Sequence, residues 1–257
     1  MLFALLSPAK KLDFNPAPDF VTATTPALLQ DTALMASRAK ELSRAQLARL
    51  MDISPKLADL NYQRFQSFDP ANARDTKAAI YAFAGDVYLG FDAKSLSKDD
   101  IAFAQKHVGI ISGLYGLLRS LDAIQPYRLE MGSSLKNVRG KDLYAFWREN
   151  LTAHINALTA AAKDITLINL ASAEYWSAVN AKALTAPVIT AAFKEVKGGK
   201  ASIVSFLAKK ARGMMARYIV QHRLTAPDQI KAFDVDGYTF DPRTSTADTW
   251  VFSRPAK

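Results

Sequence analysis

The pattern of apolar positions first marks three buried strands. Residues 1–6 are apolar throughout, and residues 165–172 contain a second run of the same kind. Residues 108–118 are also apolar and begin with β-branched side chains, but Gly113 and Gly116 interrupt them. Aliphatic and β-branched runs of this length favour strands, whereas glycine weakens a strand interior. We therefore expect a strand at each place, the third one breaking at its glycines.

Helical periodicity fills much of the chain between those strands. It predicts helices at 26–42, 43–51, 54–65, 70–83, after Ser97, at 142–162 and at 205–222. Residues 187–206 have the pattern of a hairpin that turns at 197–200, and short strands are expected at 238–240 and 250–252. Because no repeat or linker divides the chain, we predict one mixed α/β domain over residues 1–257, built on a mixed central sheet.

Composition narrows the classes of function. The chain has no cysteine, which excludes disulfides, thiolate catalysis, iron–sulfur clusters and Cys-based zinc sites. Residues 1–6 lack the features of a secretory signal, and no segment approaches the length of about 18 apolar residues that crosses a bilayer. We therefore expect a cytoplasmic protein with no membrane partner.

The positive charge is concentrated in the second half of the chain. The net charge is +9, and residues 129–257 hold 18 Lys and Arg against 11 Asp and Glu. This balance favours an anionic partner such as nucleic acid or an anionic small substrate, although many soluble proteins are simply basic.

The helix at 205–223 carries much of that charge. It has no acid, and its cations fall within an arc of roughly 160° at about 100° per residue. They are Lys209, Lys210, Arg212, Arg217 and Arg223. An ordinary solvated face usually includes Asp or Glu, because neighbouring like charges repel. We therefore favour an anion-binding face, in which Gly213 would let a phosphate backbone or a second chain segment approach closely.

Residues 112–132 form a second group of candidate anion ligands. Arg119 and Arg128 stand among glycines and tyrosines, with Glu130 close in sequence. Arginine binds phosphate through paired hydrogen bonds, and tyrosine can stack on a base or ring. The alternative is a structural crossing loop in which Arg128 and Glu130 merely pair.

The first predicted strand leads into Ser7, a proline and two adjacent lysines. Side chains of neighbouring residues in an extended chain point to opposite sides, so one lysine, preferably Lys10, should face an anion site. We expect Lys11 to be solvated or paired with Asp13.

Candidates for acid–base chemistry are few. In "FAGDVYLGF", residues 83–91, the glycines indicate a turn that presents Asp86 and Tyr88, although an Asp after Gly is more often a cap. With Glu130, these two residues are the candidates for proton transfer if the protein is an enzyme. The segment "NLASAEYW" leaves a strand with Asn169, Ser172 and Glu174, which either act at the strand's end or cap the next helix.

Familiar catalytic and cofactor motifs are absent from the sequence. The histidines, His107, His154 and His222, are not at metal-ligand spacing, and we expect no metal and no cofactor. The helices at 43–51 and 54–65 are joined tightly and could present backbone amides to a phosphate, flanked by Lys56 and Arg64. The alternative is a plain helical hairpin, because the glycines that usually shape a DNA-binding hairpin are missing.

Several long segments together resemble one family. They are "LLSPAKKLDF", "FAGDVYLGF", "SGLYGLLRSLDAIQPYRLEMG", "GKDLYAFW", "NLASAEYW" and "SFLAKKARGMMARYI". In this order they are similar to the YaaA family of bacterial peroxide-stress-response proteins. The resemblance implies a domain of unusual topology with a basic cleft and a helix-hairpin-helix element, here at 43–65, that binds double-stranded or branched DNA. It also implies protection against hydrogen peroxide, associated with keeping free iron low.

Two hypotheses follow. In the first, Lys10, Lys56, Arg64, Arg119, Arg128, Lys209, Lys210, Arg212 and Arg217 grip DNA phosphates with little sequence preference. In the second, an enzyme acts on a nucleotide-like or phosphorylated small molecule held by the same cations. A small pocket where a carboxylate and a tyrosine meet the lysines would favour the enzyme, and an open groove as wide as a duplex would favour DNA.

Overall fold

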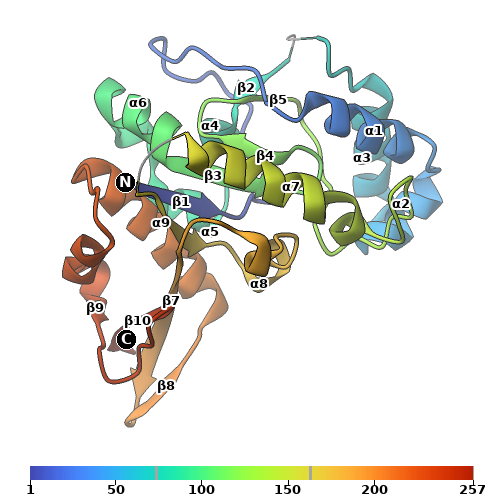
Figure 1. Cartoon of the computed structure of the whole chain (residues 1–257). Coiled ribbons are helices and arrows are strands. Elements are labelled where there is room, and N and C mark those ends of the chain that lie inside the picture. The colour runs from blue at the N-terminus through green and yellow to red at the C-terminus, as the bar shows by residue number, and fades with distance from the viewer. Residues whose placement is uncertain (73–74, 162–163, 257) are drawn as a thin grey trace.

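The computed structural model describes residues 1–72, 75–161 and 164–256. Its main sheet has eight strands with a parallel centre (Figure 1). In spatial order the strands are β4 (Gly116–Arg119), β3 (Val108–Ser112), β1 (Leu2–Leu6), β6 (Thr166–Leu170), β7 (Val188–Lys197), β10 (Thr249–Pro255) and β9 (Thr239–Phe240), with β8 (Lys200–Ser202) paired to β7. Strands β3, β1, β6, β7 and β10 run parallel, whereas β4, β8 and β9 are antiparallel to their neighbours.

Helices and two minor strands complete the domain. The helices are α1 (Leu29–Lys40), α2 (Arg44–Met51), α3 (Pro55–Ser67), α4 (Ala79–Ala82), α5 (Asp86–Phe91), α6 (Lys98–His107), α7 (Leu143–Ala160), α8 (Ala173–Trp176) and α9 (Ser205–Gln221). Strands β2 (Lys77–Ala78) and β5 (Ala123–Ile124) form a separate antiparallel pair. In Figure 1, α7 lies in front of the sheet, α1 to α3 form a group at one end, and the β7–β8 hairpin projects from the other.

The centre of the sheet has a change of winding direction. Strands β1 and β6 are neighbours, but the chain leaves β1 towards β3 on one side and leaves β6 towards β7 on the other. In open parallel sheets such a switch point opens a crevice beyond the carboxyl ends of the two strands, where ligands bind. A ligand-binding site is therefore expected beyond the carboxyl ends of β1 and β6.

Helices α5 and α9 cross at very short range. A methyl group added to Gly213 of α9 would lie 1.8 Å from the carbonyl oxygen of Val87, and one added to Gly90 of α5 would lie 2.1 Å from the carbonyl oxygen of Lys210. The two glycines thus allow the helix backbones to touch. The sequence predicts that Gly213 lets either a phosphate backbone or a second chain segment approach closely, and in the structure that second segment is α5.

The predicted fold class is confirmed, and two local predictions are wrong. In the described part of 70–83, which leaves out residues 73–74, the expected helix is replaced by β2 and the single turn α4, because Lys77 and Ala78 pair with β5. The expected turn at 83–91 is largely the helix α5, whose Gly90 serves helix packing. The expected break in residues 108–118 is present, since the chain turns between β3 and β4.

Helix length also bears on membrane insertion. In the described ranges, none of the helices is both long enough and apolar enough to cross a bilayer.

Candidate functional site

Two serines meet at the switch point. Ser7 follows β1, and Ser172 follows β6. The backbone N–H of Ser172 donates to Ser7 Oγ at 2.8 Å, and the two hydroxyl oxygens are 3.3 Å apart. The side chain of Ser172 makes no capping hydrogen bond to α8, so its hydroxyl remains at the strand ends. Pro8 cannot donate a backbone hydrogen bond and turns the chain away from the sheet here.

A cavity of about 290 Å³ opens beside these serines. We call it the carboxyl-edge pocket. Its lining includes four cations and three carboxylates, which are Lys10, Lys11, Lys209, Arg212, Asp86, Glu130 and Glu174. Tyr175 completes the wall next to Ser172. The pocket therefore offers hydroxyls, cations and acids to one small ligand.

Glu130 ties the two sides of the pocket's rim together. Its Oε1 lies 2.9 Å from Lys10 Nζ, 3.0 Å from Arg128 Nη2 and 3.2 Å from Arg128 Nε. Glu174 Oε1 accepts the backbone N–H of Gly132 at 3.0 Å, which holds the loop before α7 over α8. Arg128 and Glu130 therefore pair, as the alternative of a structural crossing loop expects, and they do so beside the pocket.

Two cations on α9 face the pocket without an acid of their own. Lys209 is exposed and Arg212 is partly buried, and neither side chain forms an ion pair or hydrogen bond with any other described residue. Burial lowers the pKa of the Arg212 guanidinium, since losing water disfavours its charged form. An anion placed here would gain two cations that are not already neutralised.

Tyr88 holds the backbone of Ser7 in place beside the site. Its buried hydroxyl donates to the carbonyl oxygen of Ser7 at 3.0 Å, and burial raises its pKa well above the ordinary value of a tyrosine. A hydroxyl already donated to the backbone and hard to ionise is a poor general base. Asp86 lies at the first position of α5 and lines the pocket, so of the two candidates it is the one whose carboxylate a ligand could reach.

Comparison with known proteins now gives the family. The family model described as peroxide stress protein YaaA matches residues 1–244. A UPF0246 protein of Magnetococcus marinus is 50% identical over 259 residues, covering 99% of this chain and 100% of its own length. UPF0246 proteins of Cupriavidus metallidurans (51% identity, 98% of each chain) and Caulobacter vibrioides (48% identity, 99% of each chain) are similar to it in the same way. The chain belongs to the YaaA family. Its role accordingly lies in peroxide stress.

Within this YaaA-family fold, the predicted anion ligands divide into two groups. The structure brings Lys10, Arg128, Lys209 and Arg212 to the carboxyl-edge pocket or its rim. Arg119 is at the opposite edge of the sheet, because β4 runs antiparallel to β3 and pairs Arg119 with Gly109. There its guanidinium contacts the buried Asp122 at 3.4 Å.

Arg217 also lies outside the pocket, where it binds the end of α5. Its Nη1 donates to the carbonyl oxygens of Phe91 and Asp92, at 3.0 and 2.8 Å. These carbonyls end α5, so Arg217 fastens α9 to that helix. Lys210 is exposed on α9 but does not line the pocket.

Helices α2 and α3 lie within residues 43–67, where the sequence predicts a helical hairpin, and neither helix lines the pocket. Ser43 and Ser54 cap them, and Asp52, in the left-handed region at φ 49°, ends α2. Lys56 is exposed in the first turn of α3, whereas Arg64 is partly buried beside Asn61 and burial lowers its pKa. The two residues therefore differ in what they can offer to a phosphate.

Sequence reasoning did not single out Ser7 or Lys11 as site residues. Lys11 is exposed without an ion pair to any described residue, and Asp13 pairs with Lys94 at 3.0 Å and Lys77 at 3.8 Å. The available signal was position in the sequence, since Ser7 follows β1 directly and Ser172 comes two residues after the end of β6. Among the described residues, no three His, Asp or Glu side chains gather as metal ligands.

Proposed function

We propose that the protein acts in the peroxide stress response by binding duplex or branched DNA with little sequence preference. The observation that carries this proposal is a pair of exposed lysines, Lys197 and Lys200, on the β7–β8 hairpin, which projects from the body of the domain (Figure 1). We call this hairpin the basic arm, and two further exposed lysines, Lys209 and Lys210, follow on α9. None of them forms an ion pair within the described part of the chain.

The arm has features of a phosphate-binding surface. Lys197 and Lys200 face each other across the hairpin, where like charges destabilise a strand pair unless an anion lies between them. The nearest acid in sequence, Glu195, is buried and paired with Arg254 at 2.9 Å. The major groove of DNA admits a two-stranded β-ribbon, and the β7–β8 hairpin is such a ribbon. By covering DNA, such a surface would limit damage from hydroxyl radicals made by free iron and peroxide.

The test is fluorescence anisotropy with a labelled duplex at several salt concentrations. Counterion release predicts that the logarithm of the affinity falls linearly with that of the salt concentration, and that each lost lysine contact lowers the slope by about one. The double variant K197A/K200A should therefore bind more weakly and with a shallower slope, and K182A, an exposed lysine on another segment, should match the wild type. The proposal would be refuted by an affinity that does not change with salt concentration, or by equal affinities of K197A/K200A and K182A. K56A tests the helical hairpin in the same assay.

The carboxyl-edge pocket favours a second function, binding and conversion of a small anionic molecule. Its size, and the meeting of Glu130 and Tyr175 with Lys10 and Lys209, fit the small-pocket alternative. Pockets that hold small ligands range from about 300 to 1,000 Å³. Thermal-shift screening with phosphorylated small molecules tests it: stabilisation of the wild type but not of K209A/R212A supports the pocket, and no stabilisation across the panel contradicts it.

A further inference from the structure

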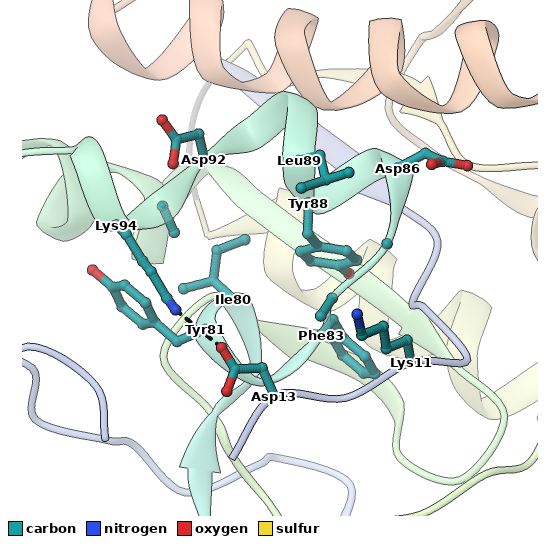
Figure 2. A pocket seen from close by; sticks show the side chains of 13 residues that line it. Lys11, Asp13, Ile80, Tyr81, Phe83, Asp86, Tyr88, Leu89, Asp92 and Lys94 are labelled. Carbon is teal, nitrogen blue, oxygen red and sulfur yellow. Dashed lines mark hydrogen bonds and ion pairs between the residues drawn. The ribbon is translucent and has the colours of Figure 1, made fainter. Parts of the chain in front are cut away.

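A second cavity adjoins the carboxyl-edge pocket. It has a volume of about 410 Å³, and we call it the side cavity (Figure 2). The two cavities share Lys11, Ala84, Gly85 and Asp86 as a common wall. Gly85 keeps this wall thin, since a methyl group on it would lie 3.1 Å from Ala9 Cβ. The backbone of this wall is closed, because the Ala84 N–H donates to the Lys11 carbonyl oxygen at 2.9 Å, so a ligand that occupies both cavities would pass over it beside the Lys11 and Asp86 side chains.

The walls of the side cavity are mostly apolar and aromatic. Figure 2 shows the rings of Phe83 and Tyr88 side by side, with centroids 5.4 Å apart, and Leu89 on α5 above them. Leu89 is 70% exposed, an unusual position for a leucine that lines a cavity. A large apolar side chain at the mouth of an aromatic cavity is suited to cover one face of a flat ring.

Polar groups stand at the other side of the cavity. Lys94 donates to Asp13 at 3.0 Å, and both line the cavity (Figure 2). Tyr81 also lines it, and its buried hydroxyl has no hydrogen-bond partner among the described residues. Burial raises the pKa of Tyr81 to about 12, so the hydroxyl remains a donor at neutral pH.

We propose that the side cavity is the ring-binding half of a two-part site, and that the ligand of this protein is a free nucleoside monophosphate. The inference rests on the second proposed function, in which the carboxyl-edge pocket binds a small anionic molecule. Lys209 and Arg212 hold the phosphate. The base lies between Leu89 and the Phe83–Tyr88 pair, with its polar edge towards Asp13 and Lys94. A sugar phosphate or inorganic phosphate would leave this apolar cavity empty.

The experiment is isothermal titration calorimetry of the full chain with the four ribonucleoside 5′-monophosphates, ribose 5-phosphate and inorganic phosphate. At least one nucleotide should bind about tenfold or more tightly than ribose 5-phosphate, because a ring buried in the side cavity adds apolar contact. L89A should weaken that nucleotide about fivefold and leave ribose 5-phosphate unchanged. Because Leu89 is exposed, this substitution should not unfold the protein. The matched control is L34A, at another exposed leucine on α1, which should bind like the wild type.

The outcomes separate the two proposals. If ribose 5-phosphate binds as tightly as every nucleotide, or if L89A and L34A behave alike, the ring-binding half is refuted while the anion pocket stands. If no phosphate compound binds, the anion pocket fails as well. If a single-stranded oligonucleotide binds in an L89-dependent way and no mononucleotide does, the cavity accepts a base from a nucleic-acid strand, and the assignment of a free nucleotide is wrong.

Discussion

The two halves of α9 carry the same kind of side chain but have different neighbours. In the first half, Lys209, Lys210 and Arg212 form no ion pair with the described residues. In the second half, Arg217 donates to carbonyls at the end of α5, and beyond the helix Arg223 lies 2.7 Å from Asp100 of α6. The cations of this acid-free segment therefore form two groups in the structure. We call the first, which has no ion pairs, the free half, and the second, which contacts α5 and α6, the anchored half. The absence of acids along a helix therefore does not show that its cations are unpaired.

Gly213 marks the point where the two halves meet, and its substitution should have the largest effect. Alanine normally stabilises a helix interior by about 1 kcal/mol relative to glycine. G213A should instead lower the free energy of unfolding by about 2–4 kcal/mol, because the new methyl group collides with the Val87 carbonyl. Urea denaturation measures this, with G132A as the control, since a methyl group there meets only the flexible Glu174 side chain at 3.3 Å. A stabilised G213A would show that α5 and α9 do not touch as described.

The anchored half should respond to R217A. Hydrogen bonds from a charged group contribute about 1.5–3 kcal/mol each, so losing those to Phe91 and Asp92 should cost about 1–3 kcal/mol after partial replacement by water. The same denaturation assay measures it. An R217A protein as stable as the wild type would remove the distinction between the two halves.

Asp100 allows the anchored half to be tested by pH. Burial alone would raise the pKa of Asp100, but hydrogen bonds from Ser97 and Arg223 outweigh it and lower the pKa below the ordinary 3.8. A carboxyl with a lowered pKa stabilises the fold above its ordinary pKa, and this stability is lost as the pH falls through the folded value. D100N should cost about 1 kcal/mol or less at pH 7 and reduce the loss of stability below about pH 4. Denaturation curves at pH 7 and pH 3 compare the two proteins, and identical acid sensitivity would contradict the assignment.

The smallest effect on stability is expected in the free half. K209A should change the free energy of unfolding by no more than about 0.5 kcal/mol, because exposed side chains without partners contribute little. It should nevertheless weaken binding of inorganic phosphate, which titration calorimetry measures. A K209A protein that is strongly destabilised would place Lys209 among the anchored cations.

Much of the secondary structure could be predicted from the sequence, but glycine positions were ambiguous. The strands at 1–6 and 165–172 are present as β1 and β6, because apolar runs determine them locally. The hairpin expected at 187–206 is present as β7 and β8 around the Gly198-Gly199 turn, but its second strand ends at Ser202, and residues 205–206 begin α9. In 83–91, by contrast, glycine indicated a turn while the structure uses Gly90 for contact with α9. A local pattern cannot distinguish a glycine that bends the chain from one that admits a neighbouring helix.

The candidate site was predictable only in part, for a similar reason. Lys10, Glu130, Lys209 and Arg212 were named from sequence and lie around one cavity. Arg119 was named by the same reasoning and lies at the far edge of the sheet, since its position depends on the antiparallel course of β4. Side-chain type can be read from sequence, whereas the edge of the sheet that a residue occupies depends on strand order.

The central position of β1 has a consequence for synthesis of the protein. Its five residues are fully enclosed between β3 and β6, yet Ser7 and its hydrogen-bond partner Ser172 are 165 residues apart in sequence. At translation rates of about 5–20 residues per second, this apolar segment waits roughly 8–30 s on the ribosome before its second neighbour emerges. During that time it is a target for chaperones that bind nascent chains, and cells short of such chaperones should accumulate more of this protein in aggregates.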